Sequence, residues 1–193
     1  MHDKWVSLSK TLYKMFADNP YWGAPEDEKP RMTRVKEGIK KHVIDVTKLL
    51  FVVAKSWNDN VVCYEYGGPK IVSVSWLSIE PADKERHTKM GNTSLRSTLT
   101  PAEELLFGCD VEIVEGDRYL LKINQEQLST RVFEIVMDKQ GNPAIIGTVN
   151  GVMCRLEHAY VQMKKGSIPQ AEYMHLYGKS VSDGKTVIER IEN

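Results

Sequence analysis

The sequence predicts a mainly β fold, an antiparallel barrel-like or sandwich domain with an N-terminal helical extension and one short internal helix. After residue 46, about ten short runs rich in Val, Ile, Phe and Tyr follow one another at close spacing. Turn sequences separate them, among them Asn150-Gly151, a strong hairpin signal. Helical patterns do not alternate with these runs, which argues against a parallel Rossmann-type sheet.

The length of 193 residues fits one domain with a terminal extension. We expect a helical extension and strap over residues 1–45 and the β domain over residues 46–193. Lys plus Arg number 26, as do Asp plus Glu, so the formal net charge is zero. This balance gives no strong nucleic-acid signal, since nonspecific binding of nucleic acid needs a clustered basic surface.

Three cysteines, Cys63, Cys109 and Cys154, lie far apart in apolar runs and form no Cys-x-x-Cys pair. This pattern favours buried free thiols in a reducing compartment over a disulfide framework or a zinc site. The first residues lack the basic and apolar regions of a secretory signal, although a protein whose signal had been removed would look the same. We therefore expect a cytoplasmic protein, without an apolar run long enough to span a membrane.

The extension contains two helical patterns and a turn-rich strap. Residues 3–17 carry apolar side chains at helical spacing, and residues 18–31 form an irregular strap in which Tyr21 and Trp22 could act as anchors. Residues 32–43 form a second, weaker helix, interrupted by a glycine.

The second helix is basic, and its charges have two interpretations. They form either a solvated face over an apolar one, or a docking face for an anionic partner such as tubulin, a lipid surface or nucleic acid. The residues considered for partner binding are Trp22, Arg34, Lys40, Lys41 and Trp57.

The β domain begins with a continuous apolar run at 47–57, which predicts a strand covered on both faces. Asn58-Asp59-Asn60 offers a tight reversal, and Gly67-Gly68-Pro69 offers a second one after the strand at 61–66. In the third strand, at 70–79, alternate residues face opposite sides. Val72, Val74 and Trp76 share one face of it.

Residues 80–99 have no apolar period and are expected to form a long loop. Arg86 and His87 in this loop could belong to a ligand site, where Arg86, Lys89 and Arg96 would hold phosphate or carboxylate groups. The alternative is that these side chains are simply solvated. Thr100, Pro101 and Glu103 then predict a capped helix that ends at Gly108.

Hairpins account for the rest of the chain. Their turns are predicted at 115–117, 139–142, 150–151 and 183–184.

The order of these elements resembles the DUF4833 family, a domain of unknown function seen in bacteria and some protists. The matching segments are LLFVVAKSWNDNVVCYEY, VSVSWLS, EELLFG, YLLKIN and TVIERI, over about residues 47–191. Trp57 departs from the small or basic residue expected at its position, and the 80–99 segment is longer than expected. The resemblance implies a fold and no activity.

Histidines and tyrosines gather near the C-terminus. His158 is expected to share a strand face with Cys154, Leu156 and Tyr160. If the next strand is its neighbour, one mixed polar and aromatic surface results. It would comprise His158, Tyr160, Tyr173, His175 and Tyr177. Such a surface could bind a ligand or could be a cross-strand aromatic ladder.

No nucleophile elbow, complete P-loop, metal-binding motif or paired-carboxylate motif occurs, so no catalytic residue, cofactor or metal is predicted. Three functions remain. The first is a non-enzymatic domain that binds a small apolar or aromatic molecule. The second is an interaction or structural component that docks through the basic N-terminal extension. The third is an enzyme that uses the 80–99 segment.

Overall fold

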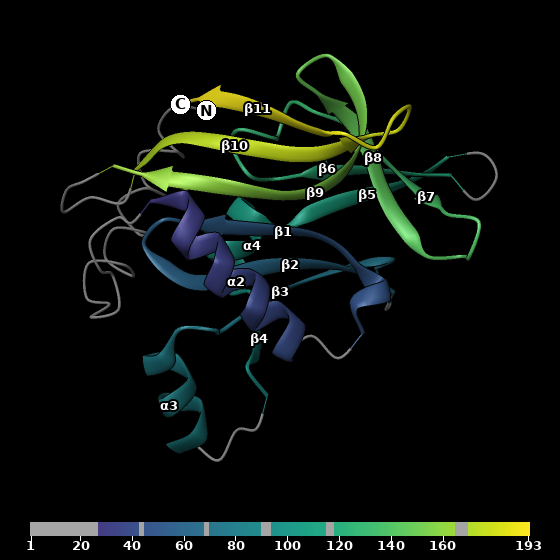
Figure 1. Cartoon of the computed structure of the whole chain (residues 1–193). Coiled ribbons are helices and arrows are strands. Elements are labelled where there is room, and N and C mark those ends of the chain that lie inside the picture. The colour runs from purple at the N-terminus through teal and green to yellow at the C-terminus, as the bar shows by residue number, and fades with distance from the viewer. Residues whose placement is uncertain (1–26, 43–44, 68–69, 90–93, 115–117, 165–169) are drawn as a thin grey trace.

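The computed structural model of the chain describes residues 27–42, 45–67, 70–89, 94–114, 118–164 and 170–193. The predicted helix at 3–17 and Trp22 lie outside these residues. Within the described part, the fold is mainly β, and a curled sheet forms a half-barrel (Figure 1). Helix α2 precedes the sheet in the chain. The elements are α2 (Glu28–His42), the 3-10 turn η1 (Val46–Lys48), β1 (Leu49–Lys55), β2 (Asn58–Tyr66), β3 (Val72–Leu77), α3 (Pro81–Lys89), β4 (Arg96–Thr98), α4 (Pro101–Phe107), β5 (Cys109–Val114), β6 (Arg118–Ile123), β7 (Phe133–Met137), β8 (Pro143–Val149), β9 (Val152–Met163), β10 (Ala171–Ser180) and β11 (Thr186–Glu192).

The described strands number eleven, against about ten expected from the sequence, and all belong to one sheet. Their order along the main path is β4-β3-β2-β1-β9-β8-β7-β6-β5, and β10 and β11 continue from the other edge of β9. Every described pairing is antiparallel except one, because β1 runs parallel to β9. That pair joins strands far apart in the sequence and brings the N-terminal β-meander against the C-terminal hairpins. The other described pairings confirm the mainly antiparallel β domain expected from the sequence, in which no hairpin turn marks the β1–β9 pair.

The hairpin turns before β8, β9 and β11 follow their sequence signals. Asn150 and Gly151 both have positive φ angles, 47° and 76°, as a type I′ turn requires, and they join β8 to β9. Gly141 and Gly184 also have positive φ in the turns before β8 and β11. The β5–β6 pairing confirms the hairpin expected there, although turn residues 115–117 lie outside the described part.

The reversal between β1 and β2 lies earlier than predicted. The turn is formed by Ser56 and Trp57, whereas Asn58, Asp59 and Asn60 already belong to β2. The prediction was wrong because these polar residues find partners in the tertiary structure, so they can enter a strand.

Two other boundaries differ from expectation. Helix α2 begins at Glu28, inside the segment predicted as strap, and it ends close to the predicted boundary. The predicted 80–99 loop contains α3 and the short strand β4. Helix α3 is almost entirely polar, so it lacks the apolar periodicity by which sequence patterns reveal a helix.

Apolar clusters cover both faces of the central strands, as the continuous run at 47–57 predicted. The cluster enclosed by the curled sheet includes Phe51, Tyr64, Leu121 and Ile145, all fully buried. Helix α4 packs on it, with its predicted Thr100–Glu103 capping box formed. Phe107 of α4 contacts Trp76 edge-on, and its carbonyl accepts a 2.6 Å hydrogen bond from the Tyr64 hydroxyl.

The second cluster lies under α2, which crosses β1 and β2 on the outer side of the sheet (Figure 1). Met32 and Val35 of the helix pack there against Val52, Cys63 and Tyr160. The helix also comes very close to Ile79, because a Cβ on Gly38 would lie 2.5 Å from the nearest Ile79 side-chain atom. The glycine inside this helix therefore serves close packing.

Candidate functional site

The polar and aromatic residues predicted to meet on two strands do lie together. Strands β9 and β10 are antiparallel neighbours, and their register places His175 opposite Tyr160 and Tyr177 opposite His158. Tyr173 is on the same strand face two residues before His175. We call His158, Tyr160, Tyr173, His175 and Tyr177 the ring cluster.

A β-bulge decides which way the β9 residues of this cluster face. Tyr177 pairs with His158, but the next residue, Gly178, pairs with Leu156, so Glu157 is an extra residue in β9. The strand face therefore switches at this point. Leu156 lies in the enclosed core, whereas Tyr160 lies under α2. The prediction that His158 shares a face with Cys154 and Leu156 was wrong, because simple alternation does not survive an inserted residue.

The rings pack mainly against one another. His158 stacks nearly parallel on Tyr177, with the ring centroids 4.3 Å apart and the planes at 12°. The Tyr173 and His175 centroids are 4.8 Å apart, and the Arg190 guanidinium lies 3.7 Å from the Tyr173 ring centroid. These contacts have the geometry of a cross-strand aromatic ladder, the structural alternative considered from the sequence.

A residue that sequence reasoning missed completes the cluster. The Glu28 carboxylate, in the first turn of α2, accepts a 2.5 Å hydrogen bond from the Tyr177 hydroxyl. Its other oxygen lies 2.7 Å from Nδ1 of His175. Glu28 and His175 are both about four-fifths buried. The sequence signal for this contact is an acidic residue in the first turn of a helix. It was missed because the helix had been expected to begin after Glu28.

Burial sets the protonation states of two members of the ring cluster. It lowers the pKa of His158 to about 4, and repulsion from Lys36 of α2 acts in the same direction. Burial also raises the pKa of Tyr177, as does its hydrogen bond to the Glu28 carboxylate. At neutral pH the cluster therefore contains an uncharged His158 and an uncharged Tyr177.

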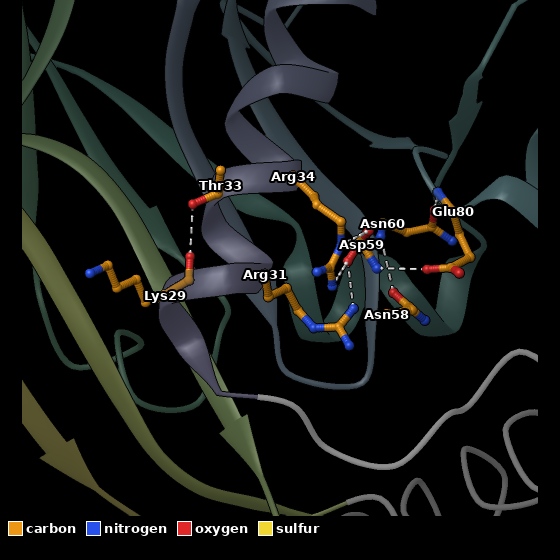
Figure 2. A network of polar contacts seen from close by, with 8 residues as sticks. All are labelled: Lys29, Arg31, Thr33, Arg34, Asn58, Asp59, Asn60 and Glu80. Carbon is orange, nitrogen blue, oxygen red and sulfur yellow. Dashed lines mark hydrogen bonds and ion pairs between the residues drawn. The ribbon is translucent and has the colours of Figure 1, made fainter.

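A second polar group fixes the same helix to the start of β2 (Figure 2). Arg31 donates from Nη1 to Oδ1 of Asp59 over 2.6 Å, and Arg34 donates from Nε to Oδ2 of Asp59 over 2.8 Å. The side chains of Arg31 and Asp59 are 7% and 9% exposed, so this ion pair is buried. Arg34, predicted as a partner-binding residue, makes an internal contact here.

The Asn58–Asn60 segment extends this network to the entry of α3 (Figure 2). Asn58 Oδ1 accepts from the backbone N–H of Asn60, and Asn60 Oδ1 accepts from the backbone N–H of Glu80. The Glu80 carboxylate in turn accepts from the backbone N–H of Asp59. Asn58, Asp59 and Asn60 belong to the segment LLFVVAKSWNDNVVCYEY, which carries part of the family resemblance, and here they join a strand to a helix.

The remaining predicted residues lie apart from the ring cluster. Arg86 and His87 lie on α3, in a part of that helix where the side chains are not described. Trp57 is 6% exposed in the β1–β2 turn, so most of its surface is already covered. Lys40 and Lys41 are exposed in the last turn of α2. The ligand and partner roles of these residues stay predictions.

Across the described ranges, no three His, Cys, Asp or Glu side chains come together in a way that could hold a metal ion. None of the described helices combines the length and apolar character needed to cross a membrane. The ring cluster and the Asp59 network both supply hydrogen bonds and ion pairs between α2 and the sheet, which is a positioning role.

Comparison with known proteins identifies the family. No curated protein and no solved structure matches the chain. The family model described as "Domain of unknown function (DUF4833)" matches residues 51–190, which is most of the chain and includes β2, β9 and β10. The chain therefore belongs to the DUF4833 family.

Proposed function

We propose that this protein is an interaction module that presents the outer surface of α2 to an acidic partner protein. Four lysines lie exposed on this surface, and we call them the lysine face: Lys29, Lys36, Lys40 and Lys41. The four lysine side chains are exposed, whereas Met32 and Val35 of the same helix pack on the sheet. One exposed acidic residue, Glu37, accompanies them.

The observation that carries this proposal is the fixed orientation of the helix. Arg31 and Arg34 hold α2 to β2 through Asp59, and Glu28 holds its first turn to β10. A helix that is held at several points presents its outward charges in one arrangement. A partner that binds these charges therefore loses less free energy to ordering of the helix than it would with a mobile one. The acidic partner follows from charge complementarity, which favours association rate and specificity.

The packing inside the curled sheet also supports an interaction role. A half-barrel that bound a small apolar molecule would need space between its walls. The curled sheet packs a contiguous cluster of its own buried side chains there, among them Phe51, Tyr64, Leu121 and Ile145. Binding of a small apolar or aromatic molecule stays a prediction, and we place the proposed function on the outer surface.

The test compares two triple charge reversals. The first, Lys36→Glu with Lys40→Glu and Lys41→Glu, reverses most of the lysine face. The matched control reverses Lys122, Lys139 and Lys164, three exposed lysines on other parts of the surface. Wild-type protein and both variants are used in quantitative pull-downs, and their affinity for a poly-glutamate peptide is measured by fluorescence anisotropy at several salt concentrations.

We expect the lysine-face variant to lose its specific partners and to bind poly-glutamate at least about tenfold more weakly, since several neighbouring charges change sign. The control variant should keep both properties. Equal recovery of the same partners by the lysine-face variant would rule the proposal out, as would an equal loss in the control.

A further inference from the structure

The described helices cover only part of the outer side of the sheet. Helix α2 lies over β1 and β2, whereas none of the described helices lies over the outer side of β10 and β11 (Figure 1). Four large apolar side chains of the C-terminal hairpins point to this uncovered side. We call them the bare face: Ile146, Met153, Val181 and Ile188.

The register of the strands shows that the bare face points outward. Ile188 pairs with Tyr177, whose hydroxyl reaches Glu28 on the α2 side of the sheet. The backbone N–H of Val181 donates a 3.0 Å hydrogen bond to the Met153 carbonyl, so these two residues are neighbours. The residue after Met153 belongs to the enclosed cluster, which directs Met153 to the opposite side.

The bare face is exposed to an extent that is unusual for adjacent apolar residues. The exposed fractions are 60% for Val181, 53% for Met153 and 47% for Ile188. Exposed Arg155 and Lys179 lie among these residues on the same strands. Single exposed apolar side chains are common, but neighbouring ones with a polar rim usually mark a contact surface.

The chain itself contains a segment that fits such a surface. Residues 1–26 lie outside the described part, and the sequence predicts a helix over residues 3–17. Its large apolar residues fall on one side at helical spacing: Trp5, Leu8, Leu12, Met15 and Phe16. Lys10 and Lys14 fall on the opposite side of the same helix.

This segment joins the described chain beside the bare face. Glu28, in the first turn of α2, bonds to Tyr177, and Tyr177 pairs with Ile188 on the adjacent strand. Val181 lies about 13 Å further along β10, at ~3.3 Å per residue. Residues 18–26 can span up to about 30 Å when extended, and a helix over 3–17 would be about 22 Å long. The segment is therefore long enough to reach and cover the bare face.

We propose that residues 3–17 pack as an amphipathic helix on the bare face, with their apolar side against Met153, Val181 and Ile188. Lys10 and Lys14 of this helix face water. The outer side of the sheet is then covered by two helices of its own chain, α2 over β1 and β2 and the N-terminal helix over the hairpins. This packing is independent of the partner proposed for the lysine face.

The tether favours this segment over a second molecule as the occupant. A short linker gives an attached segment an effective concentration on the order of 1 mM at a nearby site. A second copy of the protein in dilute solution is far less concentrated. The N-terminal segment of the same chain therefore occupies the bare face first.

Paramagnetic broadening of NMR signals in the full chain tests the proposal. In a Cys109→Ser background the two remaining cysteines are buried, so a nitroxide label attaches at an introduced cysteine. Thr186→Cys places the label on the exposed outer side of β11, close to Ile188. The matched control, Lys122→Cys, places it on exposed β6. The amide signals of residues 3–17 should lose most of their intensity with the first label and little with the second.

Two pairs of substitutions show whether the apolar side of the segment makes the contact. Leu8→Ser with Leu12→Ser should restore the signals of residues 3–17 in the protein labelled at Thr186→Cys. The same pair should increase binding of a hydrophobic dye, because the bare face becomes accessible. Lys10→Gln with Lys14→Gln, on the other side of the predicted helix, should change neither result.

A mixing experiment separates the chain's own segment from that of a second copy. Isotope-labelled protein without a nitroxide is mixed with nitroxide-labelled protein that carries no isotope. Signals of residues 3–17 should keep their intensity in this mixture, and their loss would assign the bare face to a second copy and overturn the proposal.

Equal broadening by the labels at Thr186→Cys and Lys122→Cys overturns the proposal, as does the absence of broadening with both. Broadening that persists in the Leu8→Ser, Leu12→Ser protein overturns it as well. Should Thr186→Cys fail to fold, a label at Ser182→Cys, on the exposed turn after Val181, replaces it with the same expected result.

Discussion

The two faces of the central sheet are covered in different ways. The enclosed face is covered by apolar side chains from many strands, and the outer face is covered by one helix. The enclosed cluster is held together by shape and burial, whereas α2 combines a small apolar patch with two buried polar attachments, at Asp59 and at the ring cluster. Hydrophobic packing is largely insensitive to pH and charge. The attachments of α2 involve charged side chains, so substitutions and pH changes that alter charge should act more strongly at the outer face.

The largest effect is expected from truncation in the enclosed core. Phe51 is fully buried and its ring contacts Tyr64 at a centroid distance of 5.9 Å. Phe51→Ala should lower the free energy of unfolding by about 4 kcal/mol, because a cavity replaces the ring. Urea denaturation at pH 7 and pH 5 measures this. The loss should be the same at both pH values, and a strong pH dependence would contradict the comparison of the two faces.

Removal of the single negative charge of Asp59 should lower the free energy of unfolding almost as much as truncation of Phe51. Asp59→Asn keeps the side-chain shape but removes the negative charge between the Arg31 and Arg34 guanidinium groups. We expect a loss of about 3 kcal/mol in urea denaturation, since charge removal from a buried ion pair is strongly destabilising. A change below about 1 kcal/mol would show that the pair is effectively solvated.

Stability should also depend on pH through His158. Its pKa is lowered in the folded protein, so its contribution is complete above pH 6.5 and is lost as the pH falls towards 4. Compared with His158→Phe, the wild-type protein should lose about 3 kcal/mol more between pH 7 and pH 4. His42, whose pKa is also lowered by burial and then by Lys84, is present in both proteins and cancels. Identical pH profiles of the two proteins would argue against a buried neutral His158.

The close approach of α2 to Ile79 predicts a smaller effect on stability, whose sign depends on the side chain at position 79. Gly38→Ala should add about 1 kcal/mol through helix propensity, but the new methyl group overlaps Ile79. We expect a net loss of about 1–2 kcal/mol in thermal or urea unfolding. In an Ile79→Ala background the same change should become stabilising, and additive effects of the two substitutions would contradict this packing.

The smallest effect is expected at a surface ion pair away from α2. Arg118 and Glu134 lie 2.9 Å apart, with side chains 61% and 35% exposed. Glu134→Gln should lower the free energy of unfolding by less than about 1 kcal/mol, and this loss should disappear at high salt. Comparison of this loss with the loss in Asp59→Asn distinguishes the effect of burial from the effect of charge alone. A loss as large as that of Asp59→Asn would remove this distinction.

Local sequence signals predicted the elements that depend on neighbouring residues. Thr100 and Glu103 cap a helix, Asn150-Gly151 forms a tight turn, and the apolar run at 47–57 forms a strand covered on both faces. Each of these depends on residues within a few positions of one another. The ring cluster was also predicted in outline, since adjacent hairpin strands usually pair. Helix α3 could not be found in this way because its residues carry no apolar period.

Sequence patterns were enough to predict the mainly β character, the hairpins, the buried strand and the residue types of the ring cluster. Three features depend on the folded chain: the parallel β1–β9 pair, the bulge that turns His158 away from Leu156, and the attachment of Glu28, Arg31 and Arg34. The parallel pair and the attachments join residues from about 25 to about 150 positions apart. Such contacts depend on how completed elements pack, and the polar residues that make them look from the sequence like an ordinary solvated surface.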